Sequence, residues 1–302
     1  MTTTAPAPTT ADVAPAVAKQ PSVWRSLLRN RLAAVALVLL AVIVVCALFA
    51  PLIAPADPNA QNLLGRLQPP AWQSGGSTAH LLGTDQLGRD LLSRVVYGTR
   101  VSLLVGAGAA LLAGVIGTTA GLATGYLGGW TDRVVMRVAD VQLAFPAILL
   151  ALAVVGFVGS GLGYVILVLG ITGWVSYARV VRSEVLSLRT RDFITEARAI
   201  GVDDLTIMRR HLLPNVMAPL ATIGTLHIAA AIVAEASLSY LGLGVPKETV
   251  TWGGMLADGQ LYLGTSWWIA VFPGVALMLT SLAINILGDA LRDVADPKAY
   301  RR

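Results

Sequence analysis

Apolar runs of about 20 residues recur along this chain, and each is long enough to cross the hydrocarbon core of a bilayer as a helix. Hydrophobic residues make up 55% of the 302 positions and charged ones 13%, against roughly a quarter in a soluble domain. The ten-residue alternation of a transmembrane β-barrel is absent. The sequence therefore predicts an all-α polytopic membrane protein with six transmembrane helices, near residues 32–53, 101–127, 134–157, 162–181, 215–241 and 267–287.

Lysines and arginines are distributed unevenly between the polar stretches, and this distribution predicts the topology. Six spans place both termini on one side of the membrane, and that side receives 17 of the 22 lysines and arginines. Both termini are therefore predicted to be cytoplasmic. The cations on that side are Lys19, Arg25, Arg29, Arg31, Arg133, Arg137, the seven arginines from Arg179 to Arg210, Arg292, Lys298, Arg301 and Arg302.

The same pattern divides the chain into five parts. Residues 1–21 are rich in Ala, Pro and Thr and are predicted to form a disordered cytoplasmic tail. The apolar stretch in 22–54 is too long for the core of a cleavable signal peptide, so we expect a retained first transmembrane helix. The remaining parts are an extracytoplasmic segment 55–100, a core 101–291 with five transmembrane helices and a cytoplasmic loop 182–214, and a cytoplasmic tail 292–302. Four aromatic residues are expected at the membrane interface: Trp252, Tyr262, Trp267 and Trp268.

The cytoplasmic loop is too polar to span a membrane and too long for a simple turn. Apolar residues between Leu186 and Ile200 have helical spacing, and Gly201 can end that helix. Asp203 or Asp204 can cap a second helix, which is expected to run to Pro214. The loop is therefore predicted to be a helix, a glycine bend and a second helix.

This loop resembles the cytoplasmic loop of bacterial ABC-importer permeases, where a Glu-Ala-Ala triplet precedes a glycine and a distal Leu-Pro. Ala197, Gly201 and Leu213-Pro214 carry the match, while Thr195 stands where that family has its glutamate and Glu196 lies one position away. The resemblance implies that a short helix docks on an ATPase subunit and transmits its closure to the membrane spans. The implied coupling residues are Phe193, Thr195, Glu196, Ala197, Ile200, Gly201, His211, Leu213 and Pro214.

Further blocks resemble, more narrowly, the C-type permease of dipeptide and oligopeptide importers. They are HLLGTDQLGRDLLSR at 80–94, YG at 97–98 with RVSL at 100–103, RRHLLPN at 209–215, EASLSYLGLG at 235–244 with WG at 252–253, and GDALR at 288–292 with DP at 296–297. The resemblance implies the fold of a type I ABC-importer permease in the bacterial cytoplasmic membrane, and import of short peptides. The implied partners are a second, similar permease subunit, two ABC ATPase subunits or one fused ATPase, and an extracytoplasmic substrate-binding protein.

Neither a nucleotide site nor an enzyme site is expected in this chain. A P-loop needs a lysine that closes a glycine-rich turn, and none of Lys19, Lys247 and Lys298 has that context. ATP and Mg²⁺ are therefore expected on the partner subunits. The three histidines, His80, His211 and His227, are spread over an outer loop, an inner loop and a span, so no metal site is predicted. No hydrolase motif is present, and nothing in the pattern indicates nucleic-acid binding.

Several other residues have two interpretations each. Asp140 and Glu235 are ionisable at membrane depth, so they are either pathway residues or structural polar contacts. Asp85, Arg89 and Asp90 are candidates for contact with the binding protein or the sister permease, and the alternative is a solvated helix lying on the membrane. Glycines at 117, 121 and 125 form a smooth stripe for a helix of this chain or of a partner.

Three rival functions stay open from the sequence. A related importer for another solute, such as a nickel chelate, fits the same motifs. A proton-coupled secondary transporter would use Asp140 and Glu235 as titrating groups. An integral-membrane enzyme is disfavoured because the sequence holds no nucleophile or metal cluster, and neither the secondary transporter nor the enzyme needs an amphipathic docking helix in the cytoplasmic loop.

Overall fold

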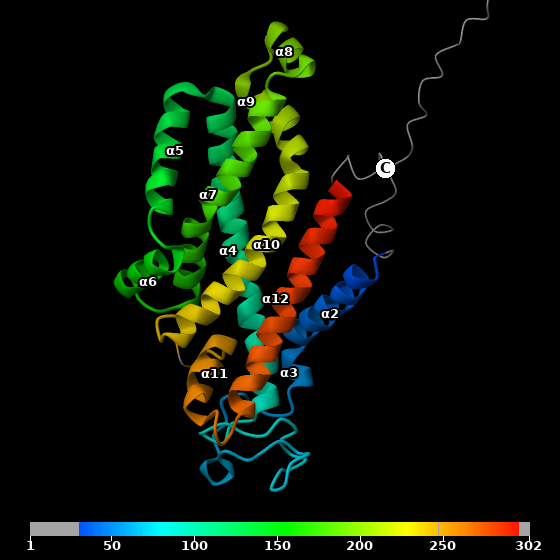
Figure 1. Ribbon diagram of the computed structural model, residues 1–302, viewed down its shortest axis with the longest axis vertical. Coiled ribbons are helices and arrows are strands. Elements are labelled where there is room, and N and C mark those ends of the chain that lie inside the picture. Colours follow the sequence, from blue (N-terminus) through cyan, green and yellow to red (C-terminus); the bar gives the residue numbers. More distant parts are fainter. Residues whose placement is uncertain (1–29, 247, 296–302) are drawn as a thin grey trace, which may run out of the picture.

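The computed structural model describes residues 30–246 and 248–295, and these residues are almost entirely helical (Figure 1). The predicted all-α class is confirmed. Within the described ranges, β-type pairing is limited to an isolated bridge between Thr84 and Asp90. The predicted tail 1–21 lies outside the described residues, as do Lys19, Arg25, Arg29 and most of the predicted tail 292–302 with its last three cations.

Five helices in the described part of the chain are each long and apolar enough to cross a membrane, and a bent helix pair brings the number of candidate spans to six if the pair crosses as one span. Because their surfaces carry many exposed large apolar side chains, the described helices suit a lipid environment. The five long helices are α2 (Arg31–Leu48), α4 (Leu91–Leu127), α7 (Leu162–Leu188), α10 (Leu213–Tyr240) and α12 (Trp268–Ala295).

The third predicted span is not one continuous helix. It is divided into α5 (Gly129–Leu143) and α6 (Ala147–Val158), which meet at 92°. Pro146 explains the break, because a proline disfavours helical geometry in the residue before it and has no N–H to donate to the preceding turn. Its ψ of 125° turns the chain away from the axis of α5, and α6 then runs crosswise to the long helices at the edge of the bundle (Figure 1).

The second span begins at Leu91 rather than at Val101, where the apolar run starts. Asp90 caps the helix, and its carboxylate accepts a hydrogen bond of 2.8 Å from the backbone N–H of Ser93. Capping of this kind satisfies one of the unpaired N–H groups at a helix start. The first two turns of α4 therefore belong to the polar segment that precedes the membrane span.

α4 and α7 pack closely along most of their length, and the glycine stripe makes this approach possible. A Cβ atom on Gly121 would lie 2.6 Å from Val181 Cβ and 2.7 Å from the Ala178 carbonyl oxygen. Gly117 faces Tyr177 in the same way, and Gly125 faces Val185. The helix that the stripe receives is therefore α7 of this chain and not a helix of a partner.

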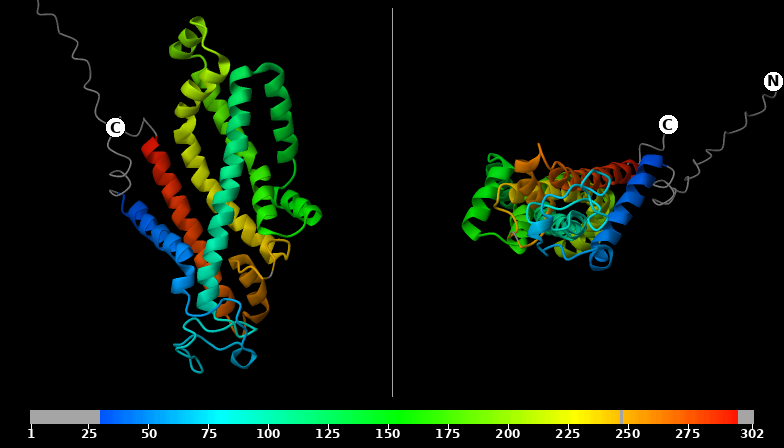
Figure 2. Two further views of the ribbon diagram at one scale, coloured as in Figure 1. Left: turned by 180° about the vertical axis from the view of Figure 1, so that it is seen from behind. Right: turned by 90° about the horizontal axis from the view of Figure 1, so that it is seen from below.

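The two ends of the bundle differ in structure (Figures 1 and 2). One end, which we call the loop end, holds residues 54–90 and α11. The opposite end, which we call the α8 end, holds the short helix α8. Besides the spans, the described elements are α3 (Ala50–Ile53), η1 (Leu63–Gly65), α8 (Asp192–Ala199), α9 (Asp204–Thr206), η2 (Ile207–Leu212), α11 (Trp252–Gly259) and η3 (Gln260–Tyr262).

Two of the aromatic residues predicted at the interface belong instead to the core of the loop end. Trp252 and Trp268 are buried in one cluster with Leu91. Trp252 donates its indole N–H to the Val95 carbonyl at 3.0 Å, and Trp268 donates to the Thr84 carbonyl at 3.1 Å. Since a buried indole needs such an acceptor, these contacts fix α11 and α12 to the start of α4 and the loop before it.

Candidate coupling site and polar networks

α8 is a short amphipathic helix that sits on the ends of three long helices. Its Ile194 and Ala197 are buried in a cluster with Val185 of α7, Leu122 of α4 and Val216 of α10. Burial of these apolar side chains anchors one face of α8 to the bundle. The predicted loop helix is therefore present, and it is separated from α7 by a short extended turn at Arg191.

The other face of α8 is exposed and partly apolar. The Phe193 side chain is 39% exposed and that of Ile200 is 81% exposed. Thr195 and Glu196 are also exposed, and the Thr195 hydroxyl donates to the Arg191 carbonyl within the helix. Phe193 on α8 and Ile200 directly after it are therefore apolar surface that the described part of the chain leaves uncovered.

Gly201 ends α8 as the sequence predicts, because it adopts a φ of +82°. Its N–H donates to the Arg198 carbonyl at 3.0 Å, and the N–H of Val202 donates to the Ala197 carbonyl at 3.0 Å. This pair of bonds is a Schellman motif, in which a glycine suits the left-handed residue. The bend is therefore a defined turn rather than a flexible joint.

The next helix begins at the predicted cap. Asp203 accepts a hydrogen bond of 2.9 Å from the N–H of Thr206. Hydrogen bonds from the Thr206 side chain and backbone lower the pKa of the Asp203 carboxyl below its ordinary value. A carboxyl with a lowered pKa stabilises the fold above its unfolded-state pKa, and this contribution is lost as the pH falls through the folded-state pKa.

The predicted end of this second helix at Pro214 is wrong. Residues from Asp204 to Tyr240 form one continuous helical stretch, in which 207–212 have π-helical geometry. His211 lies in the π-helical turn, and Leu213 and Pro214 are the first residues of α10. A proline lacks an N–H and crowds the preceding turn, so the wider π turn before it lets the helix continue. α9 and α10 are thereby joined without a break in the helix.

A residue that the sequence reasoning did not identify, Tyr126, fixes this region to α4. Its hydroxyl donates to the Asp204 carboxylate at 2.6 Å and accepts from Arg198 Nε at 3.1 Å. The Arg198 guanidinium also stacks 4.5 Å from the centre of the Tyr126 ring, a cation–π geometry. The three residues come from α4, α8 and α9, and we call this cluster the clamp; it ties α8 and α9 to the end of the span α4. Only a tyrosine at the end of the apolar run signals it in the sequence.

The two ionisable residues at membrane depth have different environments. Asp140 is exposed and forms an ion pair of 2.7 Å with Arg179, a contact that the structural interpretation of this residue anticipates. Glu235 is fully buried; one oxygen accepts from the Ser239 hydroxyl at 2.7 Å, and Oε2 has no partner among the described residues. The structure does not bring the two carboxylates together, since they lie on α5 and α10.

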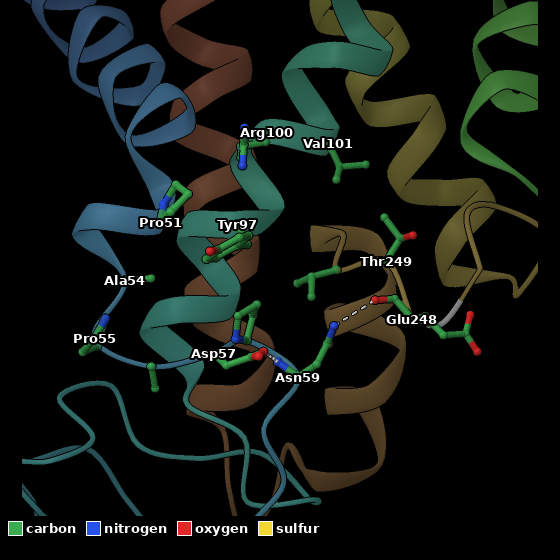
Figure 3. A pocket seen from close by; sticks show the side chains of 13 residues that line it. Pro51, Ala54, Pro55, Asp57, Asn59, Tyr97, Arg100, Val101, Glu248 and Thr249 are labelled. Atoms are coloured by element: carbon green, nitrogen blue, oxygen red, sulfur yellow. Dashed lines mark hydrogen bonds between the residues drawn. The ribbon is translucent and has the colours of Figure 1, made fainter.

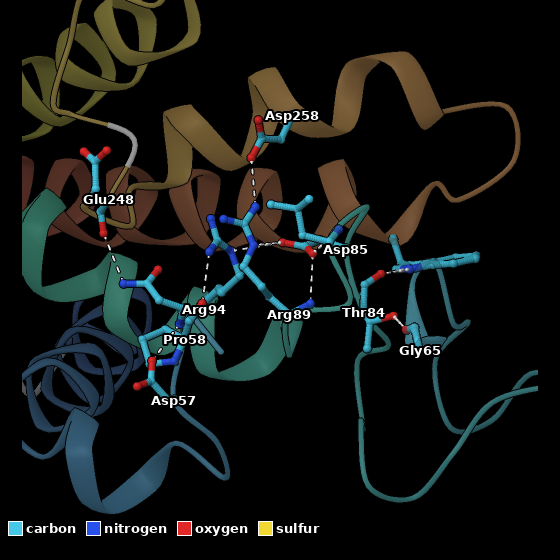
Figure 4. A network of polar contacts seen from close by, with 12 residues as sticks. Asp57, Pro58, Gly65, Thr84, Asp85, Arg89, Arg94, Glu248 and Asp258 are labelled. Atoms are coloured by element: carbon cyan, nitrogen blue, oxygen red, sulfur yellow. Dashed lines mark hydrogen bonds and ion pairs between the residues drawn. The ribbon is translucent and has the colours of Figure 1, made fainter. Parts of the chain in front are cut away.

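Asp85 and Arg89 form part of a largely buried network at the loop end (Figure 4). Asp85 Oδ2 lies 2.6 Å from Arg89 Nε and 3.5 Å from Arg94 Nε, and Arg89 Nη2 lies 3.3 Å from Asp258 Oδ2 on α11. Arg94 also donates to the Pro58 carbonyl at 3.0 Å. The network therefore ties the loop, α4 and α11 together.

The interpretation of these residues as a solvated surface helix is wrong. Residues 79–90 form successive turns, and the Asp85, Arg89 and Asp90 side chains are buried. Asp90 caps α4 and lies 2.9 Å from His80 Nδ1. Their contact with a binding protein or a sister subunit stays a prediction.

A cavity of about 760 Å³ opens beside this network, between α3, α4 and residues 248–250 (Figure 3). Asn59 spans it, since its Nδ2 donates to the Glu248 carbonyl at 3.2 Å while its N–H donates to Asp57. Tyr97 and Arg100 of α4 line the opposite wall. The cavity is open and lined by both polar and apolar side chains, and it separates the first span from the loop after α10.

The long apolar helices, the bent span and an anchored helix at one end define a polytopic membrane permease. The family comparison agrees with this class. Residues 117–301 match the model of the binding-protein-dependent transport system inner membrane component, and residues 22–70 match that of the N-terminal TM domain of oligopeptide transport permease C. The chain therefore belongs to the family of binding-protein-dependent transport inner membrane components, as a permease of the dipeptide/oligopeptide type.

Similar proteins extend over nearly the whole chain. The di/tripeptide transport system permease protein DppC of Pseudomonas aeruginosa is 42% identical over 275 residues, 91% of each chain. The glutathione transport system permease protein GsiD of Pectobacterium atrosepticum is 41% identical over 91% of this chain and 90% of its own. In the inward-facing MetNI methionine ABC transporter, one chain matches with a TM-score of 0.55 at 23% identity, over 68% of this chain and 97% of that chain. The predicted ABC-importer permease fold is confirmed.

Proposed function

We propose that this chain is the transmembrane subunit through which an ATP-driven importer carries short peptides into the bacterial cytoplasm. The names of its relatives support the cargo, since they refer to dipeptide, di/tripeptide and glutathione transport. An importer for another solute, such as a nickel chelate, is the alternative within the same family, and uptake assays separate the two.

In this proposal the α8 end lies in the cytoplasm and the loop end faces the substrate-binding protein outside. The distribution of lysine and arginine along the sequence supports this orientation. The first described residues of α2 and the last of α12 both point away from the loop end (Figure 1). Both termini are then cytoplasmic, and the buried network of Asp85 and Arg89 supports the outer surface on which the binding protein rests.

The observation that carries the proposal is the division of α8 into an anchored and an uncovered face. Ile194 and Ala197 hold the helix to the bundle, while Phe193 and Ile200 remain available to a partner. An ATPase subunit that docks on this face would move α8 together with the helices it packs on, because the Schellman turn at Gly201 holds α8 in a defined position. The push continues through α9 and the π turn into α10, so ATP binding is converted into movement of a span.

The other subunits of the proposed importer are separate chains. The proposed assembly contains a second, similar permease subunit and two ABC ATPase subunits or one fused ATPase, with ATP and Mg²⁺ bound by the ATPases. This chain then supplies no covalent chemistry. Its part is to couple two conformational states to the binding of ligand outside and nucleotide inside.

The rival prediction of a proton-coupled secondary transporter would need a titrating carboxyl in the spans, and the family match argues against it. Glu235 is fully buried at membrane depth, and its Oε2 has no partner in the described part of the chain. Such a carboxyl is a candidate proton carrier. Asp140, the other candidate, is paired with Arg179 and exposed, so a relay between the two has no geometric support.

The test is to purify the tagged chain gently, identify what co-purifies, and measure uptake in proteoliposomes. We expect a second permease and ATPase subunits, hydrolysis that a binding protein stimulates, and peptide uptake that requires ATP. Uptake of a nickel chelate but not of peptides would show that the substrate is wrong and that the ATP-driven importer is right. Transport by the lone chain under a proton gradient without ATP would overturn the proposal.

A further inference from the structure

The two helices on either side of the Gly201 bend are joined to α4 by a single side chain. α8 lies before the bend and contributes Arg198, and α9 lies after it and contributes Asp204. Tyr126, in the last turn of α4, lies between these two residues of the clamp. The ion pairs in the described part of the chain do not include one between Arg198 and Asp204. The tyrosine is therefore the link between the two sides of the bend.

The Tyr126 hydroxyl forms hydrogen bonds in both directions. It donates to an Asp204 carboxylate oxygen at 2.6 Å and accepts from Arg198 Nε at 3.1 Å. The Arg198 guanidinium lies 4.5 Å from the centre of the Tyr126 ring, so the ring and the hydroxyl hold the same side chain. Hydrogen bonds to ionised groups are roughly twice as strong as those between neutral groups. Loss of the hydroxyl would break two such bonds at once.

The apolar contacts of α8 do not fix its direction in the same way. Ile194 and Ala197 are buried with Tyr126 in one cluster, and the hydrophobic effect that holds them there is non-directional. A hydrogen bond weakens steeply as its donor angle bends, so it fixes the groups that form it. The clamp, rather than the apolar cluster, therefore sets the direction of α8 relative to α4.

The last turn of α4 is itself held in place by α7. Arg189, at the end of α7, donates from Nη1 to the Gly125 carbonyl at 3.2 Å. Gly125 also packs closely against Val185, where a Cβ atom would lie 2.8 Å from the valine Cβ. The turn that carries Tyr126 is thus fixed to one helix while it holds two others, and α9 continues into α10 without a break.

We propose that Tyr126 is a positioning residue for energy coupling, because its hydroxyl makes the end of α4 the pivot for α8 and α9. With the clamp intact, α8 and α9 keep one angle across the Gly201 bend. A displacement of α8 by a docked ATPase then turns α9 and the start of α10 with it. Without the hydroxyl, α8 shifts on its apolar face and the displacement is lost at the bend. This inference rests on the proposed ATP-driven import.

Tyr126→Phe tests the proposal, because it removes the hydroxyl and keeps the ring, its packing and its stacking against Arg198. Tyr177→Phe is the matched control. The Tyr177 hydroxyl on α7 is buried and has no hydrogen-bond partner among the described residues, so its removal breaks no bond. Each variant is purified as the whole transporter, with its partner permease, its ATPases and its binding protein.

The first measurement is hydrogen exchange at the backbone amides of residues 198–206, which contain the bend. We expect exchange there to be about tenfold faster in Tyr126→Phe. This is the lower end for the loss of a hydrogen bond to a charged group, because the Arg198 and Asp204 side chains are exposed. Tyr177→Phe should exchange at the rate of the original protein. Equal rates in all three proteins would show that the clamp does not hold the bend and would overturn the proposal.

The second measurement is the number of peptides imported per ATP hydrolysed. A purely structural defect lowers hydrolysis and uptake together, whereas a lost pivot lowers uptake alone. We therefore expect Tyr126→Phe to keep the hydrolysis that the binding protein stimulates and to lower the ratio by up to about tenfold. A ratio equal to that of Tyr177→Phe would refute the pivot, and so would a parallel fall in hydrolysis and uptake.

Asp204 supplies the same test if Tyr126→Phe does not assemble. Asp204→Asn keeps a carbonyl oxygen that can accept from the Tyr126 hydroxyl, and Asp204→Leu removes it, while both leave the buried ring in place. We expect the asparagine variant to keep the ratio and the leucine variant to lower it; equal ratios would contradict the pivot.

Failure of the proposed function gives a different result from failure of the pivot. If uptake by the original transporter does not require ATP, the proposed function is wrong. If uptake requires ATP and the ratio is unchanged in Tyr126→Phe, only the pivot is wrong.

Discussion

Removal of the Asp85 carboxylate should destabilise the loop end more than any other single change in the network of Figure 4. Asp85 is the shared partner of Arg89 and Arg94, and the three side chains are 3%, 9% and 4% exposed. In Asp85→Ala two buried cations face each other without their common anion. Breaking a buried pair in this way costs about 3–5 kcal/mol, mostly because a charge is left buried and uncompensated.

Asp258→Ala is the matched control within the same network. Asp258 lies 3.3 Å from Arg89, but its side chain is 38% exposed, so water screens the pair. An exposed ion pair contributes about 0–1 kcal/mol. Because Asp85 is buried and Asp258 is partly exposed, we expect Asp85→Ala to lower the free energy of unfolding several-fold more than Asp258→Ala does.

Thermal stability of the assembled complex in lipid nanodiscs measures the ranking, through the fraction of tagged chain that stays soluble after heating. Since each kcal/mol shifts Tm by about 2–4 °C in chains of 150–250 residues, Asp85→Ala should lower the apparent Tm by about 6–20 °C. On the same scale, Asp258→Ala should lower it by at most about 4 °C.

A triple variant separates charge from packing. Asp85→Ala combined with Arg89→Met and Arg94→Met removes all three buried charges, and such replacements are often neutral or stabilising. We expect it to recover most of the Tm lost in Asp85→Ala. Equal losses for Asp85→Ala and Asp258→Ala, or no recovery in the triple variant, would refute the electrostatic reasoning and leave loop packing as the cause.

The other predictions concern packing and the coupling region. Gly121→Leu should lower the apparent Tm of the complex, since overpacking against backbone costs about 1–3 kcal/mol, whereas Gly156→Leu, with open space around its Cβ position, should not. Gly201→Pro cannot adopt a φ of +82°, so it should abolish uptake while an immunoblot still finds the subunit in the membrane; normal uptake would rule out α8 as a lever. Asp203→Ala should increase hydrogen exchange at residues 204–208 and Asp203→Asn should not, because asparagine also caps helices.

The features that the sequence predicts well are those that one chemical property decides. Hydropathy and length are enough to find the spans, because a bilayer demands a run of apolar residues. Gly201 was predictable as a bend because glycine adopts positive φ without a steric penalty. Thr195 shows the limit of motif matching, since the structure gives its hydroxyl a contact within α8 and says nothing of a partner.

The features that the sequence predicts poorly depend on contacts between distant segments. Asp85 and Arg89 have the composition of a surface, and only the fold reveals that Asp258, far along the chain, closes a buried network with them. Trp252 and Trp268 resemble interface anchors until Val95 and Thr84 offer carbonyls to their indoles. In each case the pattern gives the residue type, and the partner that decides its role comes from another element.

The arrangement of α4 explains how one chain can connect two opposite ends. Its start is held at the loop end by the Asp90 cap and by Arg94, and its end carries Tyr126 in the clamp of the α8 end. Between them the glycine stripe packs α4 closely against α7, so we expect these two helices to move together. α10, by contrast, is continuous with α9 through the π turn. In the proposed importer, we expect closure of the ATPases to change the angle between the α4–α7 pair and α10, because α10 is joined to the α8 end through α9 and does not share the close packing of the glycine stripe.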